Sequence, residues 1–146
     1  MKKYLYLPLF ALGMLSCTED EEQASIVGSW SGDEAFVEAK YGAIPLYEET
    51  RQDFNVTLTF SEDGTVSLRD ESDGVTTTGT YTLTGDELTT DVDFDLYDLS
   101  GPLTFKVTKL TDQRLELELD DEREVNVPDF GEITVDIIGH LQFDRD

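Results

Sequence analysis

Three aspartates at alternate positions, Asp91, Asp93 and Asp95, have the spacing in this sequence that most directly suggests a chemistry. In an extended strand they share one face at intervals of about 6.6 Å, because each residue adds about 3.3 Å. Carboxylate oxygens are the ligands that Ca²⁺ takes in proteins, so the three are candidates for a calcium site. The alternative, which we favour, is a solvated outer strand face.

Residue types that carry catalysis occur without the arrangement that catalysis needs. His140 is the only histidine, so a histidine-rich metal site is excluded. A Ser/His/Asp triad needs a serine in a turn such as Gly-x-Ser-x-Gly, which the sequence lacks, and it also lacks a phosphate-binding glycine loop. The 33 acidic residues single out no pair for glycoside hydrolysis. We therefore expect a protein that is not an enzyme and needs no cofactor.

The beginning of the chain has the composition of an export signal. Lys2 and Lys3 give it a positive start, residues 4–15 are mainly apolar, and the small residue Ser16 follows. A helix that spans a bilayer needs about 20 apolar residues, so this segment is too short to serve as a membrane anchor. We predict that residues 1–16 are a cleaved signal peptide.

Cys17 is the only cysteine in the chain, so it can form no internal disulfide. Together with Met14, Leu15 and Ser16 it resembles the lipobox of bacterial lipoproteins, in which a lipid is joined to the cysteine before cleavage makes it the first residue. The resemblance implies lipidation of Cys17 and attachment of the protein to a membrane. The alternative is an unmodified cysteine within an ordinary signal sequence.

Residues 17–25 are predicted to be the lipidated cysteine and a polar tether. The acidic run at residues 19–22 resembles the surface-export signal of Bacteroidota lipoproteins. A solvated spacer is the alternative, and the sequence does not decide between the two. Thr18 stands where an aspartate retains many lipoproteins in the inner membrane. We therefore expect an outer membrane lipoprotein, exposed at the cell surface if the acidic run acts as a signal.

The charge of the chain limits its partners. The net charge is −23, and residues 1–16 hold two lysines and no acid, so the rest of the chain carries −25. Nucleic acid is excluded as a partner, because binding phosphates takes a basic surface. The part of the chain that follows the tether, residues 26–146, has the length of one domain and shows no internal linker or repeat.

Alternation of apolar and polar residues dominates residues 26–146. Phe54, Val56, Leu58 and Phe60, for example, share one strand face, with polar residues between them. We expect an all-β fold of about eight antiparallel strands, either an up-and-down barrel or a β-sandwich. Two acidic clusters, at residues 70–73 and 120–122, are expected in loops. Strands are expected at residues 26–37, 54–60, 65–69, 75–83, 88–96, 103–110, 114–119 and 133–143.

Several of these segments resemble the lipocalin-like lipoproteins of Bacteroidota. Gly28, Ser29 and Trp30 look like the Gly-x-Trp that opens the first strand of such domains, and residues 58–66 and 79–83 are similar to their hairpins. The resemblance covers most of residues 26–143. It implies a lipocalin-like barrel in which Trp30 closes one end.

An apolar stretch lies in the long first connection, residues 39–52, and contains Tyr41, Ile44, Leu46 and Tyr47. The resemblance implies that this connection crosses the open mouth of the barrel, where these residues would gate a pocket or meet a partner. Phe130, in the last long loop, is expected at the same rim. The alternatives, which we favour slightly, are a lid packed on the core and a hairpin of two further strands.

The resulting functional hypothesis is a lipid-anchored binding module of the cell envelope that holds a small apolar ligand. Thr77, Gly79, Thr90 and Gly139 are small residues at inward positions and would leave space for it inside the barrel. The alternative is a filled barrel that serves as an accessory or interaction subunit of an envelope protein complex.

Overall fold

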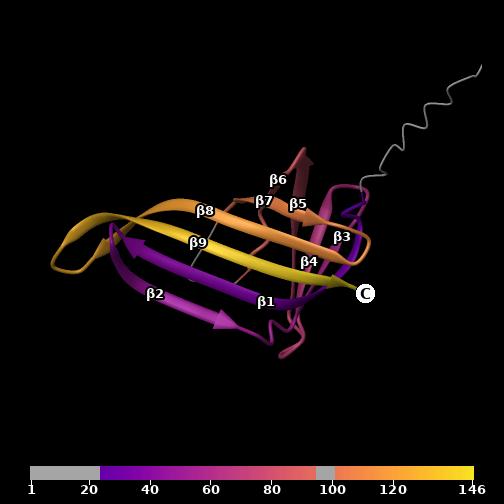
Figure 1. Ribbon diagram of the computed structural model, residues 1–146, viewed down its shortest axis with the longest axis horizontal. Coiled ribbons are helices and arrows are strands. Elements are labelled where there is room, and N and C mark those ends of the chain that lie inside the picture. The colour runs from indigo at the N-terminus through magenta and orange to yellow at the C-terminus, as the bar shows by residue number, and fades with distance from the viewer. Residues whose placement is uncertain (1–23, 95–100) are drawn as a thin grey trace, which may run out of the picture.

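Nine antiparallel strands and the turns between them make up the computed structural model, which describes residues 24–94 and 101–146 (Figure 1). Within these residues, no helix is long and apolar enough to span a membrane. The strands are β1 (Gly28–Tyr41), β2 (Ile44–Arg51), β3 (Val56–Phe60), β4 (Thr65–Asp70), β5 (Thr76–Thr84), β6 (Glu87–Thr90), β7 (Leu103–Leu110), β8 (Arg114–Val127) and β9 (Gly131–Arg145).

Strand β1 closes the sheet into a barrel because both of its edges are paired. One edge pairs with β9 along residues 30–40. The other edge pairs with β3 through residues 28–31 and with β2 through residues 35–41. From β3 to β9 each strand pairs with the next, so β1 and β3 to β9 form an eight-stranded up-and-down barrel and β2 is an extra strand. The predicted barrel is confirmed, and the β-sandwich is excluded.

The inward side chains fill the barrel with apolar groups. Trp30, Leu58, Leu88, Leu115 and Phe143 have no exposed surface, and each buried side chain of this size stabilises the fold by about 1.5–3 kcal/mol. Burial alternates strictly along β3, as the sequence predicts. The core is therefore continuous from strand to strand around the barrel.

Gly32 lies where β1 changes its pairing partner on one edge from β3 to β2. Residues 52–55 pass this point on their way from β2 to β3, and a Cβ atom on Gly32 would collide with the carbonyl oxygen and ring of Phe54. The missing side chain admits the Phe54 ring to the core, where it is 2% exposed and lies 5.9 Å from the ring of Phe143.

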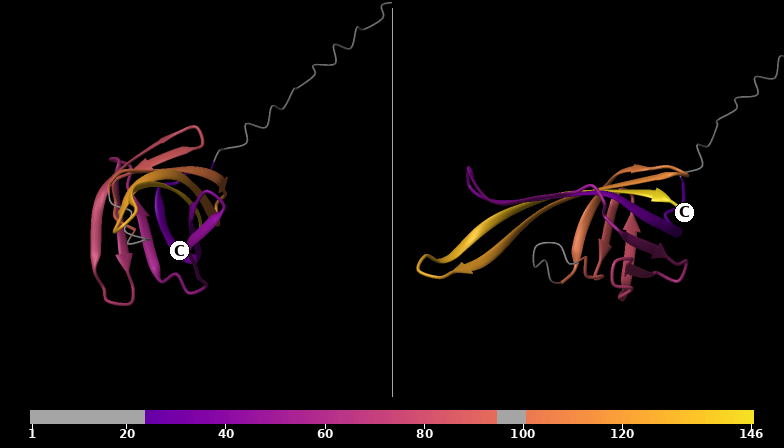
Figure 2. Two further views of the ribbon diagram at one scale, coloured as in Figure 1. Left: turned by 90° about the vertical axis from the view of Figure 1, so that its left-hand side faces the viewer. Right: turned by 90° about the horizontal axis from the view of Figure 1, so that it is seen from below.

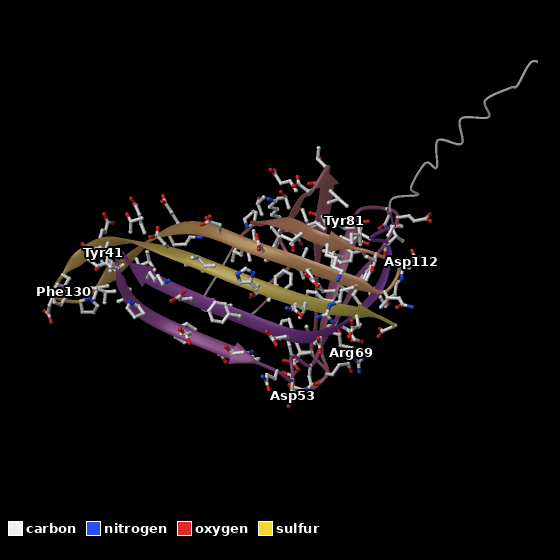
Figure 3. All side chains as sticks on the ribbon, in the orientation of Figure 1. Tyr41, Asp53, Arg69, Tyr81, Asp112 and Phe130 are labelled. Atoms are coloured by element: carbon white, nitrogen blue, oxygen red, sulfur yellow. The ribbon has the colours of Figure 1, made fainter. Side chains whose placement is uncertain are left out.

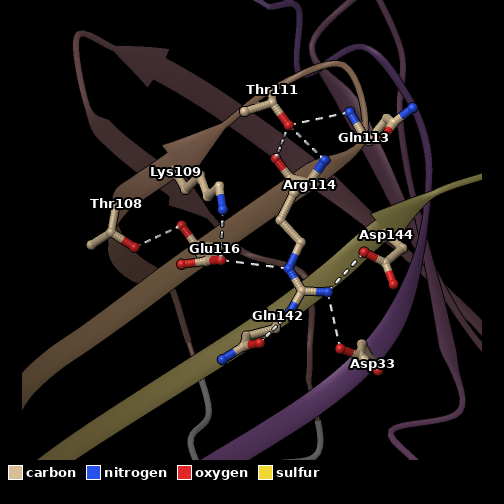
Figure 4. A network of polar contacts seen from close by, with 9 residues as sticks. All are labelled: Asp33, Thr108, Lys109, Thr111, Gln113, Arg114, Glu116, Gln142 and Asp144. Atoms are coloured by element: carbon tan, nitrogen blue, oxygen red, sulfur yellow. Dashed lines mark hydrogen bonds and ion pairs between the residues drawn. The ribbon is translucent and has the colours of Figure 1, made fainter.

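An arginine fastens three strands together on the outside of the barrel (Figure 4). Arg114 of β8 donates hydrogen bonds to Asp33 of β1 at 2.9 Å and to Asp144 of β9 at 2.7 Å, and a third to Gln142. The hydrogen bond with Asp144 is the largest cause that raises the pKa of Arg114 above its ordinary value. The contacts hold β8, β9 and β1 in register.

Two hairpins continue beyond the barrel and form what we call the arm, which consists of β2, residues 35–41 of β1, residues 120–127 of β8 and residues 131–138 of β9 (Figure 2). The four strands pair in the order β2, β1, β9, β8. One face carries the buried Ala39, Val135 and Ile137 and continues the core of the barrel. The opposite face carries several acidic residues, among them Glu38, Glu122 and Asp136.

The arm corrects two expectations. Residues 44–51, expected in a long connection, form β2, because each pairs with β1 apart from the bulged Leu46. The acidic cluster at residues 120–122, expected in a loop, lies inside β8. Asp121 fits the inner face of the arm because it forms an ion pair with Arg123 at 2.7 Å, while its two acidic neighbours face solvent.

Candidate ligand-binding site

One end of the barrel is closed by Trp30. Its indole Nε1 donates a hydrogen bond to the carbonyl oxygen of Ile26 at 2.7 Å. The guanidinium group of Arg145 lies over the indole, 4.9 Å from the ring centre, and donates hydrogen bonds to the carbonyl oxygens of Ser25 and Val27. Residues 25–27 are thus held across this end, and a ligand has to enter from the other one.

Sequence reasoning did not find Arg145. It lies 118 residues from Val27, so no local motif connects the two. A signal was present, however: Leu141, Phe143 and Arg145 alternate on the inward side of β9, and a charged residue in an inward position at a strand end indicates a partner there.

The other end of the barrel, which we call the mouth, holds a cavity of about 370 Å³. Ligand pockets in proteins range from about 300 to 1,000 Å³ and are mainly apolar. The apolar wall here consists of core side chains from β3, from β4 and from the segments that precede β3 and follow β6. It is formed by Phe54, Val56, Leu68 and Phe94, with Thr77 beside them.

The rim of this cavity is acidic. Among the described residues, Asp53, Asp70, Asp73 and Asp93 line it, together with one basic residue, Arg51. The Ser72 hydroxyl and backbone N–H donate hydrogen bonds to Asp70, and these, with the charge of Arg51, lower the pKa of Asp70 below its ordinary value. The rim therefore attracts cations at neutral pH and repels anions.

A comparison with family models identifies the family of this chain. Residues 26–117, more than half of the chain, match the lipocalin-like domain family. The chain belongs to this family. Among solved structures, a lipocalin-like protein from Bacteroides uniformis is similar: it is 22% identical, the alignment covers 82% of this chain and 97% of that one, and the TM-score is 0.48. No curated protein matches the sequence.

Four small inward residues of this lipocalin-like domain were expected to leave space for a ligand. Of these, Thr77 lines the mouth cavity. Space beside Gly79 is taken by the carboxylate of Asp91. A Cβ on Gly139 would lie 3.2 Å from the Cβ of Leu119, and Thr90 is 2% exposed, so both are packed against neighbours.

The residues expected at the rim lie elsewhere in the lipocalin-like domain. Tyr41 and Ile44 flank the β1–β2 turn, Leu46 and Tyr47 belong to β2, and Phe130 is in the β8–β9 turn. Figure 3 shows Tyr41 and Phe130 at the end of the arm, away from Asp53 at the mouth. The expectation that this connection crosses the mouth is wrong, and the alternative of a further hairpin describes the structure.

The structure describes two of the three candidate calcium ligands, Asp91 and Asp93. Asp91 accepts a hydrogen bond from the backbone N–H of Thr80 at 2.5 Å, and Asp91 and Asp93 are both exposed. Asp95 and the predicted lipidation site, Cys17, lie outside the described residues. Among residues 24–94 and 101–146, no group of three or more His, Cys, Asp or Glu side chains is placed to hold a metal ion.

A second hollow, of about 440 Å³, lies on the outer surface over β6, β7 and β8. Its lining is mainly charged, with Glu87, Lys106 and Glu118 among the residues that face it and Phe105 as its one large apolar residue. The mouth is the better candidate for a small ligand, because its wall is built from four apolar core residues.

Proposed function

We propose that this lipocalin-like domain binds a small, mainly apolar molecule, neutral or cationic, in the mouth of its barrel. The observation that carries the proposal is the apolar wall of Phe54, Val56, Leu68 and Phe94 below a rim of four aspartates and one arginine. The wall offers burial of apolar surface, worth about 25 cal/mol per Å². The rim selects by charge, because an anionic headgroup would meet like charges there.

We further propose that the domain is held in the cell envelope by a lipid on Cys17 and that it is not an enzyme. The export signal and the lone cysteine support the anchor. Ser25, near the first described residue, is bound by Arg145 at the closed end. An anchor attached there would leave the mouth open on the side away from the membrane.

A titration followed by ¹⁵N nuclear magnetic resonance tests the ligand class. The probes are decyltrimethylammonium, decanol and decanoate, each below its aggregation concentration. We expect saturable shifts of the Leu68 and Thr77 amide signals with the first two probes, and the tightest binding with decyltrimethylammonium. Tighter binding of decanoate would contradict the charge argument, and absence of saturable shifts with all three would contradict the proposed site.

Adjacent residues of β5 supply a matched pair of variants. Thr77 faces the mouth cavity, whereas Thr78 is exposed on the outer face. Thr77→Trp is expected to fill the cavity and abolish binding, and Thr78→Trp to leave binding unchanged. Equal effects of the two variants would place the ligand elsewhere.

Lipidation is tested separately by growth with a radioactive fatty acid. We expect label in the wild-type protein and none in Cys17→Ser. Absence of label from both would leave the mouth proposal standing and remove the anchor.

A further inference from the structure

Most of the exposed large apolar side chains of the described residues lie near the ends of the two hairpins of the arm. Among the described residues five are exposed: Tyr41, Ile44, Leu46 and Phe130 in the two hairpins of the arm, and Val75 beside the mouth. Phe130 is 82% exposed, more than any of the others. We call the four residues of the arm the arm tip, and they account for the clearest departure from an otherwise polar surface.

The turn that carries Phe130 is well defined. The Phe130 N–H donates a hydrogen bond to the carbonyl oxygen of Val127 at 3.1 Å, which closes the turn. Asp129 has a φ of 75°, the one positive φ of a residue other than glycine in the described part of the chain, and Gly131 follows with a φ of 82°. A backbone in this region costs energy for a side-chain-bearing residue, and such residues gather at binding sites. The turn holds the phenyl ring out in solvent instead of against the core.

Charges around the arm tip indicate the kind of partner that fits it. Glu48, Asp129 and Glu132 are exposed near the apolar residues. The nearest basic residue on β1, Lys40, is already paired with Glu38 at 2.8 Å. A second copy of this chain would bring the same negative charges to the contact, and anionic lipid headgroups would be repelled as well. A protein surface with lysines and arginines around an apolar pocket is complementary to the arm tip.

The distances along the chain also place the arm tip away from a membrane. This argument rests on the proposed lipid anchor at Cys17. Residues 17–24 would span at most about 25 Å when fully extended. From Arg145, at the closed end, to Gly131, beside the arm tip, β9 extends over about 46 Å at about 3.3 Å per residue. This length exceeds that of the tether. When the closed end faces the membrane, the arm tip therefore lies away from the membrane surface.

We propose that the arm tip is a docking site for a second protein, different from this chain, whose contact surface is an apolar pocket surrounded by basic side chains. Phe130 is the central contact, because large aromatic residues contribute most to such interfaces. The acidic residues around it orient the partner and speed its approach.

The test uses the full chain in the cells that produce it, with a photoreactive phenylalanine analogue at position 130, and at position 75 as a control. We expect one protein to be cross-linked from position 130 and not from position 75. After identification by mass spectrometry, that protein is purified and titrated with the full chain in detergent. Phe130→Ser is expected to raise Kd at least tenfold and Val75→Ser to leave it unchanged, and higher salt is expected to raise Kd severalfold.

Other results would overturn the proposal. These are the absence of a protein cross-link from position 130, an equal cross-link from position 75, a cross-link to a second copy of the chain, and a Kd that Phe130→Ser does not change. A fluorescent residue at position 130 whose emission shifts to the blue on vesicles of phosphatidylethanolamine and phosphatidylglycerol would show a membrane contact instead. The titration needs no anchor, so it tests docking even if Cys17 is not lipidated and if the mouth binds nothing.

Discussion

Replacing Arg145 with methionine is expected to weaken the closed end of the barrel more than its place next to the C-terminus would suggest. The substitution keeps most of the apolar stem and removes the guanidinium group. Two hydrogen bonds to carbonyl oxygens are lost, worth about 1 kcal/mol each. The stacking on Trp30 adds about 0.5–1 kcal/mol at a partly exposed site. The free energy of unfolding should therefore fall by about 3 kcal/mol.

Thermal and urea denaturation of the chain from residue 24 onward measures this loss. We expect the melting temperature to fall by about 10 °C, at about 3–4 °C per kcal/mol for a domain of this size. The fluorescence of Trp30, the only tryptophan, should shift to the red in the folded variant as water reaches the indole. Arg69→Met is the control. Arg69 forms an exposed ion pair with Glu71 at 3.3 Å, so this substitution should lower the free energy of unfolding by at most about 1 kcal/mol. Equal losses in the two variants, with unchanged Trp30 emission, would refute the role given to Arg145.

Three further predictions concern stability. Gly32→Ala is expected to cost more than about 3 kcal/mol by calorimetry, because the added Cβ meets the backbone of Phe54, and a loss below 1 kcal/mol would contradict this. Arg114→Met is expected to cost about 1–2 kcal/mol in urea denaturation, because it removes hydrogen bonds to β1 and β9, and an unchanged midpoint would contradict their role. The pKa of Asp63 lies below its ordinary value of 3.8, mainly because Thr65 donates hydrogen bonds to it. Its contribution to stability is therefore present above pH 4 and is lost as pH falls through the folded pKa. Urea midpoints of wild type and Asp63→Asn should differ above pH 4 and converge in stronger acid, and a constant difference would be contrary evidence.

The sequence predicts the barrel well where one face of a strand is buried and the other is exposed to solvent. Residues 54–60 show this alternation, and β3 occupies residues 56–60 of this predicted strand. A hairpin at residues 39–52 was one of the alternatives, but the full arm was not predicted, for two physical reasons. Pro45 interrupts an apolar stretch that has no strict alternation, so β2 resembled a loop. The three successive acids at residues 120–122 resembled a turn because a run of charged residues is typical of loops. They fit a strand because Asp121 forms an ion pair with Arg123, and the sequence alone does not show this contact.

The candidate site is harder to predict than the fold. Thr77 was expected to border a cavity, and it does. Phe54, Leu68 and Phe94 could be recognised as inward residues, but they come from separate segments of the chain, and only the closed barrel brings them together at the mouth. The same holds for Arg145, which reaches Trp30 from the far end of the chain.

Native mass spectrometry of the protein purified from the cells that produce it tests the central claim most directly. We expect one small molecule per chain, apolar and either neutral or cationic, in the wild type and in Thr78→Trp, and none in Thr77→Trp. A wild-type chain that carries no small molecule, or a bound molecule that Thr77→Trp retains, would contradict binding in the mouth of the barrel.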